Sequence, residues 1–86
     1  MIIYLHKNFS KKYTRLTKSQ KEKFKIHRNL FMADEFDPIL NNHALSGRYE
    51  GYRSINVTGD IRAIYKKISA EKVIFVTIGN HSNLYR

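Results

Sequence analysis

Two short stretches of this chain carry the polar side chains that could do chemistry. Residues 51–66 place four of them among apolar neighbours: Ser54, Asn56, Asp60 and Arg62. Further on, His81 and Tyr85 follow an apolar run that ends at Ile78. Histidine can carry a proton near neutral pH, and arginine keeps a fixed positive charge. On a chain with a net charge of +9, this combination predicts a site for chemistry on a polyanion.

The positive charge restricts the partners. Sixteen Lys and Arg residues stand against seven Asp and Glu, and residues 1–32 hold nine of the basic residues and one acid. A field of this kind attracts nucleic acid, anionic lipid or an acidic protein, and nucleic acid is the favoured partner. Taken one by one, most of the lysines in the first half are typical of a solvated helix face.

Composition excludes several other classes. Eighty-six residues predict a single domain, residues 1–86, with a modest core. Without cysteine there are no disulfides and no thiolate chemistry, and four histidines without close spacing are a poor metal-ligand set, so we expect neither metal nor cofactor. We also expect no membrane span and no signal peptide, and hence a cytoplasmic protein.

The first half of the chain predicts one strand and two helices. Residues 1–6 form a β-rich run. A helix follows with an apolar stripe at Phe9, Tyr13 and Leu16, capped by Asn8 or Ser10. A second helix over about 19–33 can begin at either of two capping boxes, Thr17 with Gln20 or Ser19 with Glu22. Its apolar residues fall into two groups, which predicts a broad buried face: Phe24 and Phe31, and Ile26, Leu30 and Ala33.

The second half predicts strands. Residues 37–47 are an irregular connector, because the residue before Pro38 disfavours the helical region. Strand patterns then cover residues 52–57, 61–66 and 73–78. The order β-α-α-β-β-β predicts an α+β fold, with a helical hairpin packed on one face of a mostly antiparallel four-stranded sheet.

Side-chain sorting selects the register of the hairpin between the strands 52–57 and 61–66. A two-residue loop would mix apolar and charged side chains on both faces. A three-residue loop, residues 57–59, pairs Asn56 with Asp60 and places Gly59 in the left-handed position that closes such a loop. Its apolar face then turns toward the helices, and the other face is open and polar. The apolar face comprises Arg53, Ile55, Val57, Ile61, Ala63 and Tyr65; the polar face comprises Tyr52, Ser54, Asn56, Asp60, Arg62 and Ile64.

These segments resemble a known family. HALSGRYEGYRSINVTGDIRAIYK followed by VIFVTIGNHSNLY is similar to the RelE/ParE-type toxins of toxin–antitoxin modules, in particular to the YafQ-like ribosome-dependent endoribonucleases. The motifs cover residues 43–86, and the order of elements extends the resemblance over the rest. The same fold includes toxins that act on DNA gyrase, so the fold alone does not fix the activity.

The resemblance implies roles for individual residues. His43, Asp60 and His81 match catalytic positions of the YafQ-like proteins, and Tyr85 matches an aromatic near the scissile nucleotide. Arg62 stands where the RelE branch has an arginine on the reacting phosphate. Asn56 departs from the pattern, because YafQ-like proteins have a further histidine there and asparagine cannot carry a proton near neutral pH.

Cleavage of RNA without a metal needs a base for the 2′-hydroxyl, an acid for the 5′-oxygen and positive charge at the phosphorane. We assign His81 as the acid, His43 or Asp60 as the base or orienting group, and Arg62 as the stabilising cation, helped by Arg53 or Arg48. The residues expected to bind RNA are Arg48, Tyr49, Tyr52, Arg53, Asn56, Lys66 and Tyr85. Of these, Arg53 points toward the helices in the chosen register.

Each assignment has a structural alternative. His81 and His43 could be solvated loop residues, and Tyr85 could fill the core. Asp60 could satisfy backbone donors at the turn or pair with Arg62 across the strands. His6 and His27 are expected to be structural or surface residues.

The sequence therefore predicts a small toxin that cleaves mRNA on the ribosome. We expect a cognate antitoxin with an acidic segment that wraps the toxin, and operator DNA contacted only through the antitoxin complex. The alternatives are a ParE-like gyrase inhibitor and a non-catalytic nucleic-acid-binding protein of the same fold.

Overall fold

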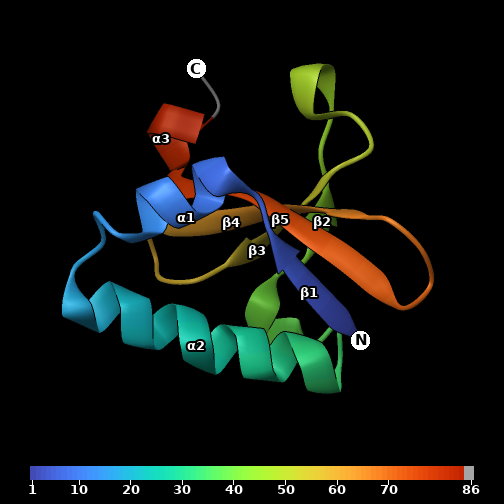
Figure 1. The fold of residues 1–86 in the computed structure, drawn as a ribbon, viewed down its shortest axis with the longest axis horizontal. Coiled ribbons are helices and arrows are strands. Elements are labelled where there is room, and N and C mark those ends of the chain that lie inside the picture. The colour runs from blue at the N-terminus through green and yellow to red at the C-terminus, as the bar shows by residue number, and fades with distance from the viewer. Residues whose placement is uncertain (85–86) are drawn as a thin grey trace.

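The computed structural model describes residues 1–84 and consists of a mixed sheet with helices around it (Figure 1). The strands are β1 (Ile2–Leu5), β2 (His43–Ala44), β3 (Arg53–Asn56), β4 (Ile61–Lys67) and β5 (Lys72–Asn80). The helices are α1 (Lys7–Tyr13), α2 (Lys18–Ala33) and α3 (His81–Leu84), with two 3₁₀ turns, η1 (Pro38–Leu40) and η2 (Gly47–Tyr49). The strand order is β1-β5-β4-β3-β2, with only the β1–β5 pair parallel. The predicted α+β class and the mostly antiparallel sheet are confirmed.

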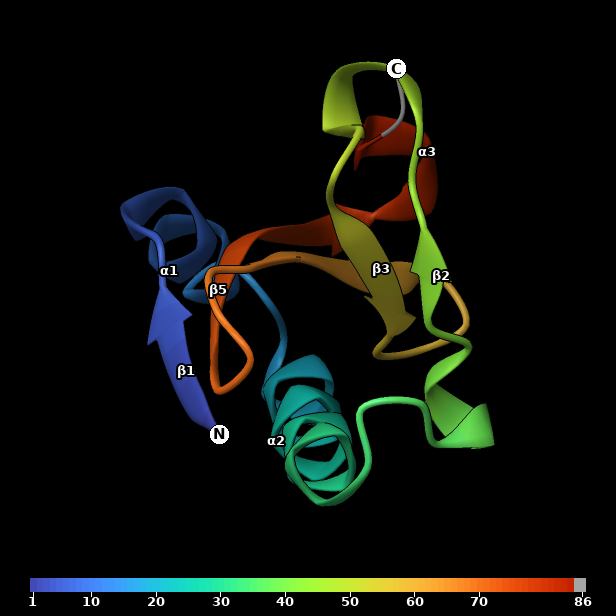
Figure 2. The same ribbon diagram turned by 90° about the vertical axis from the view of Figure 1, so that its right-hand side faces the viewer.

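The layers set one face of the sheet apart for the site. Figure 2 shows α2 lying across one face, while α3 and the η2 turn rise from the opposite face. Helix α1 lies at the β5 side of the sheet, past the end of the short strand β1. The two helices of the hairpin therefore take different positions: α2 covers one face of the sheet, and α1 flanks β5.

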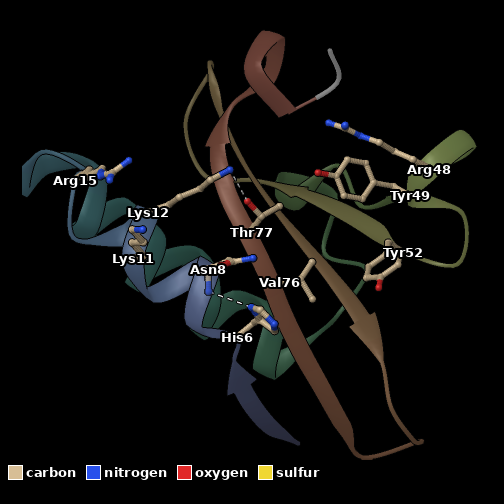
Figure 3. A pocket seen from close by; sticks show the side chains of 10 residues that line it. All are labelled: His6, Asn8, Lys11, Lys12, Arg15, Arg48, Tyr49, Tyr52, Val76 and Thr77. Atoms are coloured by element: carbon tan, nitrogen blue, oxygen red, sulfur yellow. Dashed lines mark hydrogen bonds between the residues drawn. The ribbon is translucent and has the colours of Figure 1, made fainter.

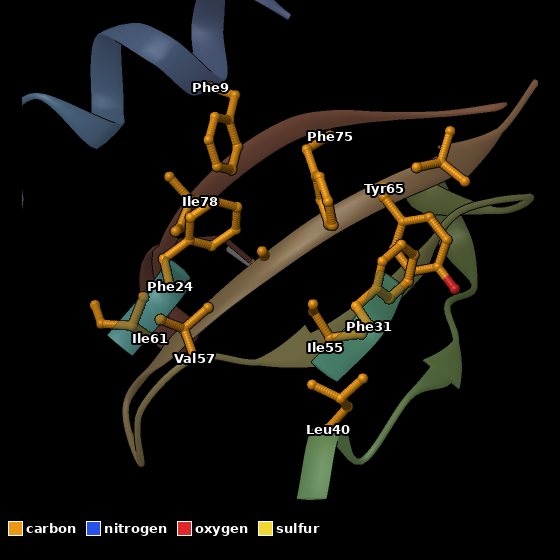
Figure 4. Close-up of a cluster of buried hydrophobic side chains, with 12 residues drawn as sticks. Phe9, Phe24, Phe31, Leu40, Ile55, Val57, Ile61, Tyr65, Phe75 and Ile78 are labelled. Carbon is orange, nitrogen blue, oxygen red and sulfur yellow. The ribbon is translucent and has the colours of Figure 1, made fainter. Parts of the chain in front are cut away.

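The core lies between α2 and the sheet (Figure 4). Its centre is a group of aromatic rings in which Phe75 contacts Phe9, Phe24, Phe31 and Tyr65 at centroid separations of 5.4–5.8 Å. These separations are typical of tilted and edge-to-face aromatic pairs. Four of these residues are predicted in the core: Tyr65 on the helix-facing side, and Phe9, Phe24 and Phe31 by their helical patterns. Phe75 is predicted only as part of the strand over residues 73–78.

A β-bulge in β5 changes which of its side chains point to each face of the sheet. Ile64 pairs with Thr77, but the next residue of β4, Tyr65, pairs with Phe75, so Val76 is the extra residue. As a result Phe75 and Ile78 both reach the core, whereas Thr77 turns to the opposite face. Nothing in the alternation of residues 73–78 marks this bulge, and the sequence analysis did not predict it.

The hairpin register differs from the predicted one by two residues. Asn56 pairs with Arg62 rather than with Asp60, and Val57 donates to the carbonyl of Ile61 at 2.9 Å. The loop is therefore residues 58–60, still three residues long, and Gly59 is not left-handed. Instead the Thr58 hydroxyl accepts from the amides of Asp60 and Ile61, at 3.2 and 3.0 Å, and closes the turn. A shift of two leaves every side chain on its predicted face.

Several local predictions need correction. His6, not Asn8 or Ser10, caps α1, because its Nδ1 accepts from the Asn8 amide at 3.0 Å. Of the two capping boxes for α2, Thr17 with Gln20 is the one formed. Ile26 is 54% exposed, so the buried face of α2 is narrower than predicted.

The number of strands and the sheet face opposite α2 also differ from expectation. The predicted irregular connector contains β2, in which His43 pairs with Ser54; two residues are too few to give a strand pattern. The face opposite α2 is not wholly open, because Ile64 and Leu84 are buried outside the main core cluster. There α3 lies close over β5: a Cβ built on Gly79 would stand 3.6 Å from the Leu84 side chain.

A polar cluster fixes the β2 end of the sheet. The Tyr65 hydroxyl donates to Glu35 at 2.6 Å and accepts from the Asn42 amide at 2.7 Å, and Lys67 pairs with Glu35 at 3.0 Å. Burial of the Tyr65 phenol raises its pKa, and the hydrogen bond to the Glu35 carboxylate raises it further. Asn42 immediately precedes His43, so this cluster holds the start of β2.

Candidate functional site

A cavity of about 510 Å³ lies where the β3–β4 loop meets the end of β5. Its lining combines one acid, one base and one cation with small polar groups: Gly59, Asp60, Arg62, Asn80, His81 and Ser82. Three of the four predicted catalytic residues, Asp60, Arg62 and His81, thus line one cavity. We refer to it as the hairpin cavity.

Main-chain hydrogen bonds hold two of these residues in place. The His81 amide donates to the Asp60 carbonyl at 3.0 Å, which ties the start of α3 to the hairpin loop. On the other side of His81, the Asn80 side-chain oxygen accepts from the Ser82 amide at 2.9 Å and from its hydroxyl at 2.7 Å. His81 is therefore set in a turn that is fastened at both neighbours, with its ring exposed.

Arg62 sits beneath this turn in the middle of the sheet. It pairs with Asn56 on β3 and with Gly79 on β5. Among residues 1–84, its Nη1 atom is buried and has no hydrogen-bond partner. No salt bridge joins Arg62 to Asp60 in this part of the chain, so the alternative of a plain cross-strand ion pair is not what the structure shows. A buried guanidinium nitrogen without a partner is costly unless a ligand supplies an acceptor.

Asn56 is held from the helix side. Its carbonyl oxygen is hydrogen-bonded to His27 Nδ1 of α2, so His27 braces β3 from the opposite face. This supports the structural interpretation of His27, and the cap formed by His6 does the same for that residue. The contact with Asn56 uses only its main chain, which leaves its side chain beside Arg62.

His43 lies apart from the hairpin cavity. It is on the edge strand β2, opposite Ser54, and two strand steps separate β2 from β4, the strand that carries Arg62. At about 4.8 Å a step, that is roughly 10 Å of sheet between the two strands. The His43 ring is exposed, its Nδ1 lies 3.0 Å from the Asn41 carbonyl oxygen, and it lines neither cavity described here.

A second cavity, of about 550 Å³, opens on the same face of the sheet between α1 and η2 (Figure 3). Its lining is rich in cations and aromatic rings and holds no carboxylate: His6, Asn8, Lys11, Lys12, Arg15, Arg48, Tyr49, Tyr52, Val76 and Thr77. We refer to it as the basic cleft. Three residues predicted to bind RNA, Arg48, Tyr49 and Tyr52, line it, and Lys66 lies over the Tyr52 ring at 5.5 Å.

Another predicted RNA-binding residue, Arg53, lies elsewhere. Arg53 is on the helix-facing side, where its Nε donates to Asn42 at 2.8 Å and its guanidinium lies 5.2 Å from the Phe36 ring. It does not share a face with Arg62, and it lines neither the hairpin cavity nor the basic cleft. Tyr85 lies outside the described residues.

Sequence reasoning missed residues at both cavities. Asn80 and Ser82 flank His81, and an Asx-type turn at Asn-His-Ser was a readable signal for them. Sequence analysis predicts a solvated helix face for most of the N-terminal lysines, which include Lys11 and Lys12, and gives no role to Arg15. Nothing in the sequence shows that these residues border η2.

The hairpin cavity has the groups that a phosphodiester reaction needs. A histidine can give or take a proton, a carboxylate can take one or orient the histidine, and an arginine can bind phosphate through two parallel hydrogen bonds. Within residues 1–84 there is no cluster of three or more residues suited to hold a metal ion. The same residues include no helix long and apolar enough to cross a membrane.

Solved structures with a similar fold include several bacterial toxins. A crystal structure of YafQ from E. coli strain BL21(DE3) superposes with a TM-score of 0.81 at 25% identity, covering 98% of this chain and 97% of that one. A YoeB/ParE toxin from Agrobacterium tumefaciens gives a TM-score of 0.78 at 19% identity over 94% and 99%, which shows the shared fold. YafQ in the E. coli DinJ–YafQ toxin–antitoxin complex gives 0.78 at 26% over 98% and 96%. A comparison with curated protein sequences finds no match.

The fold and these neighbours define a type II toxin of the RelE superfamily. The particular family follows from a sequence model described as the bacterial toxin of type II toxin–antitoxin system, YafQ, which matches residues 1–86. The chain belongs to this YafQ toxin family. The resemblance found in residues 43–86 is thereby confirmed and extended to the N-terminal half.

Proposed function

We propose that this toxin is an endoribonuclease that cleaves mRNA on the ribosome. The observation that carries the proposal is the hairpin cavity, which Asp60, Arg62 and His81 line together. The guanidinium of Arg62, whose buried Nη1 has no partner among residues 1–84, is suited to bind a phosphate oxygen. Membership of the YafQ family supports the same activity.

The reaction is an attack by the 2′-hydroxyl on the adjacent phosphorus. The new P–O2′ bond forms as the P–O5′ bond breaks, which leaves a 2′,3′-cyclic phosphate and a free 5′-hydroxyl. His81 protonates the departing 5′-oxygen, and Arg62 stabilises the charge on the phosphorane. Asp60 lines the same cavity as His81 and takes the proton of the 2′-hydroxyl or orients the group that does. His43 does not line the hairpin cavity, so we assign it a contact with the RNA outside this cavity.

The partners follow from family and charge. E. coli YafQ has been solved in a DinJ–YafQ toxin–antitoxin complex, and we propose that this chain likewise binds a cognate antitoxin. With a net charge of +9, the toxin suits an antitoxin with an acidic segment that wraps around it. Operator DNA would be contacted through the antitoxin complex, and the site of action is cytoplasmic.

Primer-extension mapping of transcripts after brief induction tests the activity. We expect new 5′ ends at positions aligned with codons for the wild-type chain and none for His81→Gln. Codon-aligned cuts that persist unchanged in the variant would remove His81 from catalysis. Growth arrest without any cuts would instead favour a gyrase inhibitor of this fold.

Ribosome dependence needs a separate measurement with purified protein. A synthetic mRNA is incubated with toxin in the presence and absence of a stalled ribosome that displays a vacant A site. Cleavage only with the ribosome is the expected result, and equal cleavage of the free mRNA would contradict that part of the proposal.

A further inference from the structure

The basic cleft is separate from the hairpin cavity and lies across α3 from it. The first residues of α3 line the hairpin cavity, while the carbonyl of Leu84, at its end, accepts from Arg48 Nη2 at 3.0 Å. Leu84 also packs over Gly79 of β5. Helix α3 therefore forms a partition, with the catalytic groups on one side and the cleft on the other.

The charge of the cleft comes from both of its walls. Figure 3 shows Lys11, Lys12 and Arg15 on the α1 side and Arg48 on the η2 side, with Val76 and Thr77 between them. The four cations have no carboxylate among the residues that line the cleft. Such a set repels itself unless an anion enters, because like charges share one concave space.

One of the lysines is fixed in place over the floor of the cleft. Lys12 Nζ donates to the Thr77 hydroxyl at 3.1 Å, although 65 residues separate the two in sequence. The β-bulge at Val76 is what turns Thr77 to this face. The cation is therefore positioned by the sheet, unlike a lysine that extends freely into solvent.

Aromatic rings complete the lining. Tyr49 and Tyr52 lie edge to face with their centroids 6.1 Å apart. Cations lie over both rings, Arg48 over Tyr49 at 5.2 Å and Lys66 over Tyr52 at 5.5 Å. Alternation of aromatic rings with cations is the pattern that binds single-stranded nucleic acid, in which bases stack and phosphates are neutralised.

We infer that the basic cleft is an anchoring site for single-stranded RNA, which binds a stretch of the substrate away from the scissile phosphate. The inference rests on the proposed function in that the RNA is the one cut in the hairpin cavity. It adds that binding and cutting use different residues on opposite sides of α3. RNA fits better than an acidic protein segment. The carboxylates of such a segment could pair with the cations of the cleft, but they would not use the tyrosine pair, on which RNA bases can stack.

Equilibrium binding of a short dye-labelled single-stranded RNA, read by fluorescence anisotropy, tests the inference. All proteins carry His81→Gln, so cleavage does not enter the measurement. The test variant is Lys11→Gln with Lys12→Gln; the matched control is Lys18→Gln with Lys23→Gln, two exposed lysines of α2. Both variants lose the same charge, and thermal unfolding checks that both are folded.

Counterion release gives the size of the expected effect. Each lost phosphate contact on a single strand lowers the magnitude of the slope of log K against log salt concentration by about 0.7. The slope of the test variant should therefore be smaller in magnitude by about 1.4, and the variant should bind RNA about tenfold more weakly near 0.15 M salt. The control should keep the wild-type slope. Because Lys12 also binds Thr77, Lys11→Gln alone repeats the test with an expected loss of about 0.7. Equal weakening of test and control would overturn the inference, since it would show a diffuse surface field.

Stacking is tested with an abasic RNA of the same length. Removal of the bases should weaken binding to the protein that has Tyr52. It should have little effect on binding to Tyr52→Leu, because this variant has no ring at position 52 on which a base could stack. Equal losses in both would remove the aromatic contact. A glutamate-rich peptide of the same charge that binds as tightly as the RNA, and depends equally on Tyr52, would overturn the assignment in favour of an acidic protein partner. None of these results depends on whether the wild-type chain cuts RNA.

Discussion

The main chains of Asp60 and His81 are hydrogen-bonded to each other, with the His81 amide nitrogen 3.0 Å from the Asp60 carbonyl oxygen. These two residues are far apart in sequence, and both were nominated for proton transfer. Because the bond uses no side-chain atom, the position of each residue is fixed independently of its chemistry. Substitutions that change only the side chain should therefore test catalysis without moving the backbone.

Asp60→Asn is the first such change. It keeps the shape of the side chain and the main-chain bond to His81 but removes the negative charge. We expect the cleavage rate to fall by about 100-fold or more, as for the loss of a general base, with an unchanged melting temperature. Single-turnover cleavage and thermal unfolding are measured on the same preparation. A variant with full activity would limit Asp60 to the turn.

Arg62→Met separates activity from stability. The side chain loses its charge, and with it the buried Nη1 atom that has no partner within residues 1–84. Cleavage should be abolished, while the free energy of unfolding in urea should stay within about 0.5 kcal/mol or rise, because no satisfied interaction is lost. Arg62→Lys keeps the charge but not the bidentate geometry and should recover only part of the activity. A marked loss of stability in Arg62→Met would show that the guanidinium supports the fold.

Asn56→His restores the residue type that the YafQ-like pattern has at this position. Asn56 lies opposite Arg62, and its hydrogen bond to His27 of α2 is made through its carbonyl group. The substitution should therefore fold normally and leave the activity equal or higher. A pH–rate profile should then gain a new ionisation in the range of histidine, near pH 6.5. A large loss of activity would instead show that the asparagine amide makes a specific contact with RNA.

Tyr65→Phe changes how stability depends on pH. Burial and the Glu35 carboxylate raise the pKa of Tyr65 above its ordinary value of 10.0. The neutral phenol is thus favoured in the folded state, so its contribution is fully present below pH 10 and is lost as the pH rises toward the folded-state pKa. Wild-type stability should fall above pH 10 with a steeper slope than that of Tyr65→Phe, as measured by urea unfolding at several alkaline pH values.

The same variant should be less stable at neutral pH. It loses the hydrogen bonds of the Tyr65 hydroxyl to Glu35 and Asn42, which together contribute about 2 kcal/mol. Asn42→Ala is the comparison: it also breaks the cluster but leaves the phenol in place, so its alkaline slope should stay close to that of the wild type. Parallel slopes for wild type and Tyr65→Phe would show that other groups control the alkaline limit.

The sequence predicted what depends on periodicity and failed where contacts between distant segments decide. Alternation was enough to sort Ile55, Ala63 and Tyr65 from Asn56 and Arg62, and the sorting survived an error of two residues in register because two is the period of a strand. The closing residue of the loop was mistaken because Thr58, rather than a left-handed glycine, satisfies the turn.

The site was predicted in part for the same reason. Asp60, Arg62 and His81 belong to motifs with a family pattern, and all three line one cavity. The lysines of α1 carry no motif, and their placement beside η2 depends on how α1 lies against β5. The strand β2 and the position of His43 outside the hairpin cavity likewise follow from strand pairing, which the local sequence does not encode.

The bulge at Val76 makes the chain sensitive to the number of residues in β5 as well as to their identity. Phe75 and Ile78 are three residues apart, so in a strand of the same length without the bulge they would point to opposite faces. One of the two would then leave the core, or the following segment, with Asn80 and His81, would turn to the other side of the sheet. Length variation among related toxins should accordingly be tolerated in the surface turn at residues 68–71, between β4 and β5, and be selected against between Lys72 and His81.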